Sequence, residues 1–293
     1  MKKDIPHIKF DKKDDVQFEF EIVPIQKISK NKNQYTHSPE LPHQVKFYNL
    51  IFFTSGTGRH FIDFNWYPVQ ENTLVYLAKE QVNAFDFSND LDGYCIIFTE
   101  KHFVQCFPNL PEDLVFRLFN PQLFSPILQI PLESAFNSYF KLLKEEYHNS
   151  NIFNKQTVIN ALFTILISKA EQIKQKQPFH IKDNSKIVVF QKFNSLIEEN
   201  LMISRSANFY ANELGITYKH LNSICKELMN KTAKNVIDDL VILKAKRILI
   251  NSDIKSTELA YKLGFEDPTN FTKYFKKNTS LTPKSFIKSI LNE

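Results

Sequence analysis

The stretch LAYKLGFEDPTNFTKYFKK, residues 259–277, decides the fold of the C-terminal third of the chain. A short helical pattern reaches Leu263 and Gly264, and a second helical pattern starts at Asp267 and Pro268. Glycine supplies the left-handed backbone that commonly ends a helix. Aspartate is a favoured helix cap, and proline suits the first helical position. The stretch therefore predicts two short helices joined by a tight turn, which is a helix-turn-helix.

The same unit occurs once before in the chain. YANELGI (210–216) aligns with LAYKLGF (259–265) at an offset of 49 residues, and beyond the turn the offset becomes 50. Gly215 takes the place of Gly264, and Thr217 is the expected cap of the following helix. In a helix-turn-helix the second helix enters the major groove of DNA. The doubled unit therefore predicts two DNA-reading helices in one chain.

One helix is predicted to connect the two copies. TAKNVIDDLVILKAKRILIN (232–251) has a continuous helical pattern of 20 residues, and a helix of that size is ~30 Å long. Successive major grooves on one face of B-DNA lie ~34 Å apart. The connecting helix can therefore hold two reading helices about one DNA turn apart.

Helical spacing separates a core face from an outward face in each reading helix. The core faces are predicted to hold Leu221, Ile224, Cys225, Phe271, Tyr274 and Phe275. The outward faces are predicted to hold Lys219, Asn222, Ser223, Lys226, Thr269, Asn270, Lys273, Lys276 and Lys277. Phosphate contacts fix the register on DNA without reading sequence. The residues expected to make them are Thr217, Lys226, Lys276 and Lys277. The alternative for any one polar residue here is an ordinary solvated position.

Positive charge is concentrated in the same third of the chain. From residue 186 onward there are 17 Lys and Arg against 11 Asp and Glu, a balance of +6. Residues 1–185 balance to −1. A localised basic excess suits a polyanion such as double-stranded DNA.

The composition is that of a folded protein without a secretory or membrane segment. Hydrophobic residues make up 43% of the chain and charged residues 24%, which is typical of globular proteins. The N-terminal stretch MKKDIPHIKFDKKDD is charged where a signal peptide would be apolar. No apolar run approaches the ~18 residues of a membrane span. The three cysteines form no CxxC pair, which favours reduced thiols. We therefore expect a soluble cytoplasmic protein.

Two regions of different character precede the helical third. Residues 41–108 contain short runs rich in β-branched and aromatic residues, separated by turn signals. This pattern favours an antiparallel sandwich or a small barrel. Residues 110–177 change to a helical period. The polar segment 177–185 marks the expected boundary, so we expect one domain at 1–180 and another at 186–293.

Apolar positions at helical spacing in residues 110–177 have two explanations. They are Phe136, Tyr139, Phe140, Leu143, Tyr147, Val158, Ile159, Leu162, Phe163, Leu166 and Ala170. The second set, which begins at Val158, can pack on the sheet of its own domain. It can also form a two-fold dimer interface, because antiparallel helix pairs make self-complementary contacts. Both explanations stay open, and the second makes the chain a homodimer.

The C-terminal third resembles the DNA-binding domain of the AraC/XylS family of bacterial transcription regulators. The resemblance covers residues 186–290 and rests on the LAxxLGF turn at 259–265, the helix NFTKYFKK and the ending LTPKSF at 281–286. It implies seven helices with two helix-turn-helix units, and an N-terminal effector or dimerisation domain. The expected fold class is α+β, with an N-terminal cupin-like antiparallel β-barrel, a helical dimerisation segment and an all-α C-terminal domain.

The resemblance also implies roles for individual residues. Carried over by position, the base-edge contacts are Lys219, Asn222, Ser223, Thr269, Asn270 and Lys273. Asparagine can pair with adenine, lysine can reach guanine, and serine or threonine can accept either partner. The family implies transcription regulation at the bacterial nucleoid, with a lean toward activation and therefore toward RNA polymerase as a partner.

The chain departs from the usual family pattern at a few positions. Asn230 and Ser280 stand where the family usually has glycine after each reading helix. Cys225 replaces a usual phenylalanine, Ala233 a usual proline and Val241 a frequent arginine. Most of these changes lie in the first unit or in the connecting helix. The resemblance therefore applies most closely to the DNA contacts of the second unit.

Two other classes of function compete with a sequence-specific regulator. A metal-dependent enzyme fused to a DNA-binding tail needs clustered histidine and carboxylate ligands, usually with an HxH pair. The region offers His37, His43, His60 and His102, which form no such pair. We therefore expect no catalytic residues, no metal and no cofactor. A non-specific architectural DNA-binding protein would bind with little sequence preference, and the mild net charge of +5 argues against it.

Two explanations remain for the aromatic residues of the N-terminal region: they line a ligand pocket, or they fill the core. An aromatic-lined pocket can bind a small organic effector, and the chain has 28 Phe and 11 Tyr. The alternative is that these rings only pack against one another. The candidate effector-binding residues are Tyr48, His60, Trp66 and Tyr76.

Overall fold

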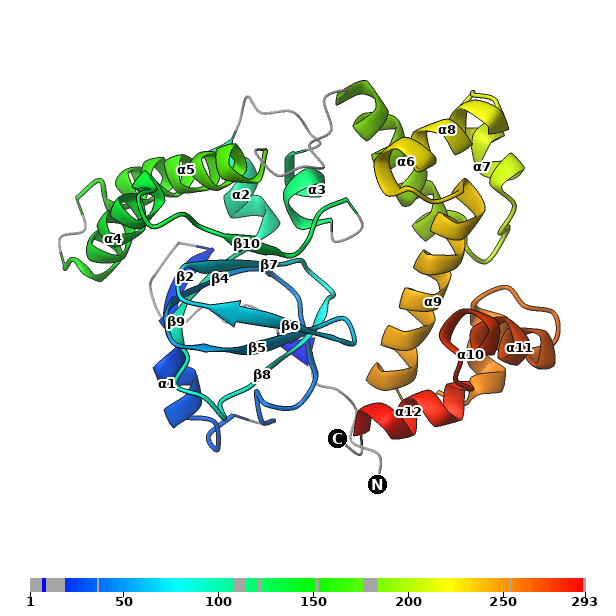
Figure 1. Cartoon of the computed structure of the whole chain (residues 1–293), viewed down its shortest axis with the longest axis horizontal. Helices are drawn as coiled ribbons and strands as arrows, with labels where there is room; N and C mark the ends of the chain where they lie inside the picture. The colour runs from blue at the N-terminus through cyan, green and yellow to red at the C-terminus, as the bar shows by residue number, and fades with distance from the viewer. Residues whose placement is uncertain are drawn as a thin grey trace. The chain divides into compact units, whose positions relative to one another are not determined.

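The computed structural model shows the chain as two compact units, Pro6–His180 and Ile181–Glu293 (Figure 1). It describes residues 7–8, 19–35, 37–107, 114–120, 123–150, 153–175, 184–252 and 254–291. Most of the predicted boundary segment 177–185 therefore lies outside the described residues.

The first unit contains two five-stranded sheets. One sheet has the order β1 (His7–Ile8), β3 (His43–Val45), β8 (Val82–Phe85), β5 (Thr57–Ile62) and β6 (Asn65–Gln70). The other has the order β10 (Ile127–Gln129), β7 (Thr73–Leu77), β4 (Tyr48–Ser55), β9 (Asp92–Phe98) and β2 (Phe20–Pro24). The pairs are antiparallel, except that β1 runs parallel to β3.

Alternation along β4 gives this unit two separate cores. Side chains in a strand point alternately to opposite faces. Ile51 and Phe53 therefore pack between the two sheets, with Ile62 from the facing sheet. Leu50 and Phe52 point to the other face of their sheet, where helices cover it (Figure 1).

The predicted cupin-like barrel is wrong in one respect, because the two sheets do not close. In the described strands, hydrogen bonding ends at β1 and β6 in one sheet and at β10 and β2 in the other. The strands also extend beyond the predicted region 41–108, since β1, β2 and β10 lie outside it. The coarser prediction of an antiparallel β region followed by helices is confirmed.

The helices of the first unit bury most of the predicted apolar stripes. They are α1 (Ile25–Lys30), α2 (Glu100–Cys106), α3 (Leu114–Phe119), α4 (Ala135–His148) and α5 (Lys155–Lys174). Ile159, Phe163, Leu166 and Ala170 of α5 are buried in the core beneath the helices. Val158 is 39% exposed, so it does not take part in this packing.

Seven helices form the described part of the second unit, as the family resemblance implied. They are α6 (Asn184–Asn200), α7 (Ala207–Glu213), α8 (Tyr218–Met229), α9 (Ala233–Asn251), α10 (Ser256–Lys262), α11 (Pro268–Thr279) and α12 (Pro283–Leu291). The predicted connecting helix is confirmed as α9, and Thr232 caps its start.

Helix α9 is the central helix of the second unit. Its side chains Val236, Ile237 and Ala245 are fully buried. Helices α7 and α8 contact it from the first half of the unit, and α10, α11 and α12 contact it from the second half (Figure 1). Both helix-turn-helix units therefore pack against one helix. No helix in the described ranges combines the length and apolar character that crossing a membrane requires.

Candidate nucleic-acid interface

The first helix-turn-helix consists of α7, a tight turn and α8. Helix α7 ends at Glu213 with Leu214 as its cap, and Gly215 follows with a left-handed φ of +66°. The Oγ1 atom of Thr217 accepts a hydrogen bond from the His220 amide at 3.1 Å and caps α8. The buried face of α8 holds Leu221, Ile224 and Cys225. The predicted stop, cap and core face are confirmed.

The second helix-turn-helix consists of α10, a turn and α11, and it has the same construction. Gly264 has a left-handed φ of +71° after Leu263. The Asp267 carboxylate accepts a hydrogen bond from the Thr269 amide at 2.7 Å, and Pro268 is the first helical residue. That amide donor lowers the pKa of the Asp267 carboxyl. The predicted stop and cap are again confirmed.

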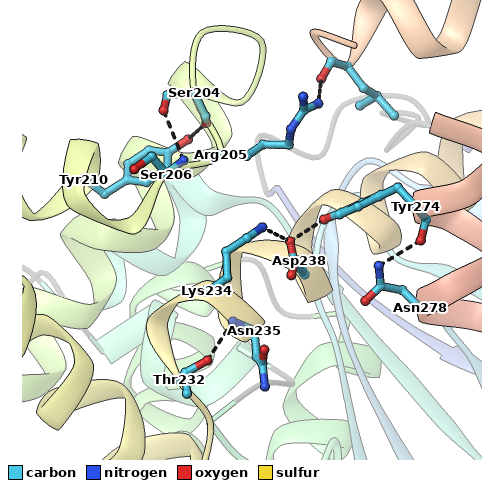
Figure 2. Close-up of polar contacts among 11 residues, drawn as sticks. Ser204, Arg205, Ser206, Tyr210, Thr232, Lys234, Asn235, Asp238, Tyr274 and Asn278 are labelled. Carbon is cyan, nitrogen blue, oxygen red and sulfur yellow. Dashed lines mark hydrogen bonds and ion pairs between the residues drawn. The ribbon is translucent and has the colours of Figure 1, made fainter. Parts of the chain in front are cut away.

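The core face of α11 differs from the prediction at one residue. Phe271 and Phe275 are fully buried, as predicted. Tyr274 is only half-buried, and its hydroxyl donates to Asp238 Oδ1 on α9 at 2.5 Å (Figure 2). A tyrosine at the edge of a buried face can keep its ring packed and its hydroxyl bonded to a polar partner. Tyr274 is therefore a polar contact between two helices as well as a packing residue.

Most of the predicted outward residues are exposed on the two reading helices. These are Thr217, Lys219, Ser223, Lys226, Thr269, Asn270, Lys273, Lys276 and Lys277. Their exposure leaves them accessible to a partner along one side of each helix. Lysine, asparagine and hydroxyl side chains at the start of a recognition helix are the groups that read base edges and hold phosphates.

Asn222 is placed differently from the other predicted outward residues. It is half-buried, and its Oδ1 atom accepts a hydrogen bond from the Ala233 amide at 3.0 Å. Ala233 is the first residue of α9, so its amide has no acceptor within the helix. Asn222 therefore ties the recognition helix α8 to the start of α9.

His220 occupies an outward position that the residue pattern had not singled out. The 50-residue offset between the copies aligns it with Asn270, and both residues are exposed in the first turn of their helices. The same offset aligns Asn222 with Thr272, whose hydroxyl donates to the Pro268 carbonyl at 3.1 Å within its own helix. The internal repeat alone therefore could have identified His220.

Comparison with known proteins agrees with the doubled unit. A helix-turn-helix domain model matches residues 210–289, which contain the second unit and all of the first except the start of α7. The HTH-type transcriptional activator RhaS of Pectobacterium carotovorum is 20% identical over 251 residues, covering 83% of this chain and 86% of RhaS. Residues 210–289 therefore form a helix-turn-helix domain of the AraC/XylS type. The function of this family is transcription regulation through DNA binding and not enzymatic catalysis.

Two further similarities are to a curated relative and to a solved structure. An uncharacterized HTH-type transcriptional regulator of Pseudoalteromonas carrageenovora is 33% identical over 103 residues, and the match covers 32% of this chain and 61% of that protein. The crystal structure of ToxT from Vibrio cholerae with a bound unsaturated fatty acid gives a TM-score of 0.49 at 13% identity. That similarity covers 94% of this chain and 97% of ToxT.

The first recognition helix carries an acidic residue beside its outward face. Glu227 aligns with Lys277 of the second helix at the 50-residue offset. Lys186 of α6 places its Nζ atom 2.8 and 2.7 Å from the two carboxylate oxygens of Glu227. The pair neutralises a charge that would otherwise repel phosphates, but it leaves α8 less basic than α11.

The four candidate effector residues of the regulator do not converge on one site. Tyr48 and Tyr76 both contact Phe119, with ring centroids 4.9 and 5.5 Å apart, in the core under the helices. His60 lies between the sheets against Phe85, at a ring distance of 4.9 Å. Burial lowers the pKa of His60 to about 3. The fourth residue, Trp66, is 39% exposed.

Trp66 lies on the outer face of its sheet because it pairs with Phe61, the neighbour of His60 on β5. The guanidinium of Arg59 covers its ring at 4.1 Å. Trp66 is therefore separated from the two cores. Within the described ranges, no group of three or more His, Cys, Asp or Glu side chains has an arrangement that could hold a metal ion.

A residue outside the predicted set lies close to Tyr76. Lys174 of α5 is 4% exposed, and its Nζ atom donates to the Leu118 carbonyl at 2.9 Å. The same ammonium lies 4.3 Å from the ring centre of Tyr76 and 4.9 Å from that of Phe124. The Tyr76 hydroxyl is buried without a hydrogen-bond partner among the described residues. Burial lowers the pKa of Lys174 to about 7.

Proposed function

We propose that this regulator recognises a specific DNA sequence by placing α8 and α11 in successive major grooves. The observation that carries the proposal is the matched pair of helix-turn-helix units on one 19-residue helix, α9. At 1.5 Å per residue this helix is ~28 Å long, which is close to the ~34 Å between grooves. Recognition helices present their N-terminal residues to the bases, and both helices are exposed there.

The residues on the outward sides of the two helices divide into proposed base contacts and proposed phosphate contacts. Base contacts are proposed for Lys219, His220, Asn222, Ser223, Thr269, Asn270 and Lys273. Phosphate contacts are proposed for Thr217, Lys226, Lys276 and Lys277. Asn222 would donate from its Nδ2 atom, because its Oδ1 atom already accepts from the α9 backbone.

Selection of bound duplexes from a random pool tests this proposal. The wild-type chain is expected to enrich two short sequence blocks about one helical turn apart. A matched variant, Lys219→Ala with Lys273→Ala, is expected to enrich neither block strongly. One short block would mean that a single unit engages DNA. No enrichment by the wild-type chain would favour the architectural alternative.

We propose further that residues 1–180 form a sensor and dimerisation domain. The buried Lys174 ammonium beside the unpartnered Tyr76 hydroxyl favours a small organic anion as the effector. A carboxylate could accept hydrogen bonds from both groups, and the surrounding aromatic rings would contact its apolar part.

A thermal-shift screen of the full chain tests the effector proposal. Carboxylic acids of increasing size are compared with their neutral amides, since a ligand that binds the folded state raises the melting temperature. We expect stabilisation by an acid and not by its amide, with the shift lost in Lys174→Met. Flat results for every acid would favour a constitutive or protein-responsive regulator.

We propose that two copies of the chain associate through the outer face of α5. Val158 and Ile165 lie on this face and are 39% and 36% exposed, and seven residues separate them, which is about two helical turns. Sedimentation of the wild type as a dimer and of Ile165→Lys as a monomer would support the proposal. Identical sedimentation of both proteins would exclude this face.

We propose that the protein activates transcription, as the name of RhaS says of that relative, and that it contacts RNA polymerase to do so. Transcription in vitro from a promoter that carries the selected site is the test. Addition of the protein is expected to raise transcript yield. A lower yield would make it a repressor at that site.

A further inference from the structure

Asp238 joins the second recognition helix to α9. Its Oδ1 atom accepts a hydrogen bond from the Tyr274 hydroxyl of α11 at 2.5 Å, and the same carboxylate pairs with Lys234 one turn earlier on α9 (Figure 2). The Asp238 side chain is only 17% exposed, so this bond is partly shielded from water. Burial and the neighbouring carboxylate raise the pKa of Tyr274, which keeps its hydroxyl a donor.

A second polar contact joins the loop between α6 and α7 to the turn of the same unit. The Arg205 guanidinium donates to the carbonyl oxygens of Leu263 and Gly264 at 3.0 and 3.3 Å. It lies 3.6 Å from the ring centre of Phe265. The ring of Tyr274 packs on Phe265 as well, at 5.3 Å. Arg205 and Tyr274, which each belong to one of these two polar contacts, therefore both pack on Phe265.

The first recognition helix is also fixed to α9, through the bond from the Ala233 amide to Asn222. Helices α8 and α11 are thus each held to the same helix by a polar contact as well as by packing. We propose that the Asp238–Tyr274 pair positions α11 relative to α8 and so sets the spacing between half-sites that the protein accepts. This inference rests on the proposed two-groove binding.

The role assigned to the pair is positioning and not folding. Phe271 and Phe275 are fully buried and account for the attachment of α11 to the core. Removal of one hydroxyl leaves these contacts in place, whereas the helix loses the bond that restrains its rotation about the buried face. DNA affinity at the correct spacing depends on that restraint, because an unrestrained helix must be ordered on binding.

Binding of the full-length chain to a series of duplexes tests the proposal. Each duplex carries the two selected half-sites, at the selected spacing or with one or two base pairs added or removed. The wild type is expected to bind the selected spacing tightly and the others much more weakly. Tyr274→Phe is expected to bind the selected spacing roughly tenfold more weakly and to discriminate less between spacings.

Three further proteins sharpen the comparison. Asp238→Ala removes the other partner of the bond, and the double variant is expected to behave like either single variant, since the two residues act as one pair. Asn278→Ala is the matched control, because it removes a bond to the Tyr274 carbonyl that stays within α11. Its spacing profile is expected to match that of the wild type.

The outcomes separate the inference from the function on which it rests. A steep, unchanged spacing profile in both Tyr274→Phe and Asp238→Ala would overturn the positioning role and leave two-groove binding intact. A wild-type chain without any spacing preference would instead remove two-groove binding and the inference together. Melting temperatures of all the variants show whether a flat profile comes from an unfolded domain.

Discussion

Ser280 closes the second recognition helix with a left-handed backbone, at φ +63°. This conformation costs an L-residue roughly 1–2 kcal/mol, and glycine avoids the cost. Ser280→Gly is therefore expected to raise the free energy of unfolding by about 1 kcal/mol, measured by urea denaturation. The hydrogen bond from the backbone N–H of residue 280 to the Lys276 carbonyl oxygen is retained, because glycine keeps the N–H group.

The equivalent residue of the first unit provides the control. Asn230 also has a left-handed φ, +53°, but asparagine tolerates this region better than serine does. Asn230→Gly is expected to gain only a few tenths of a kcal/mol. A gain at Asn230 as large as that at Ser280 would show that the left-handed backbone costs asparagine as much as it costs serine.

Lys174 makes the stability of the first unit depend on pH. Its pKa falls from 10.5 in an exposed chain to about 7 in the folded protein because it is buried. Below pH 7 both states hold the proton, and the folded state bears the full cost of a buried charge. Between pH 7 and 10.5 the unfolded chain binds more protons, so the free energy of unfolding rises with pH.

Lys174→Met is expected to remove this rise and to raise the melting temperature at pH 6 by several degrees. The measurement is thermal unfolding at pH 6, 7.5 and 9 for wild type and variant, with Lys141→Met as the control. Lys141 has a 74% exposed side chain on α4, so its replacement should leave the pH profile unchanged. Parallel profiles for the wild type and Lys174→Met would contradict the assignment.

At the scale of elements, the two turns are alike in conformation and different in surroundings. A Cβ atom on Gly264 would lie 2.4 Å from the Met202 carbonyl oxygen, whereas one on Gly215 would meet nothing within 4 Å. Gly215→Ala is therefore expected to cost only the left-handed strain, roughly 1–2 kcal/mol. Gly264→Ala adds a backbone clash, which raises the cost by roughly 1–3 kcal/mol.

Urea denaturation of the two alanine variants measures this difference directly. Equal losses would mean that the loop at Met202 moves away without cost. In that case the packing of the α6–α7 loop on the second turn would contribute little to stability. A larger loss at Gly264 would show that this loop and the second helix-turn-helix are one packed structure.

Elements governed by local chemistry could be predicted from the sequence. The stops at Gly215 and Gly264, the caps at Thr217 and Asp267, and helix α9 depend on residues close together in the chain. The strands β2 and β10 depend on pairing with distant partners, and the sheet edges depend on where that pairing ends. Local patterns carry no such information, so the open sheets were not predicted.

Residues at the border of a helix face were the least predictable part of the site. Asn222 and Tyr274 lie at about a quarter turn from the centre of their buried or outward faces, where spacing allows either orientation. Their partners, Ala233 and Asp238, belong to α9, which spacing within one helix cannot locate. In the same way, helical period identified the apolar positions of α5 but not that Val158 would be left exposed.

At the scale of the whole molecule, the two recognition helices carry unequal charge. Helix α11 presents Lys273, Lys276 and Lys277, whereas α8 presents Lys219 and Lys226 beside the neutralised Glu227. Phosphate contacts supply most of the sequence-independent affinity. The second unit is therefore expected to bind DNA more strongly without regard to sequence, and the first unit to contribute mainly through specific contacts.

Lys273 is the lysine of α11 that we propose to contact a base, and paired changes of protein and DNA can test this role. Lys273→Ala is expected to cost ~1–3 kcal/mol of binding to a duplex with both selected half-sites. On a duplex whose second block is scrambled, the same substitution should cost much less, because the base contact is already absent. Lys219→Ala should show the reverse dependence, losing affinity only where the first block is intact. Equal losses of Lys273→Ala on both duplexes and on random DNA would make it a phosphate contact, since phosphates are present in every sequence.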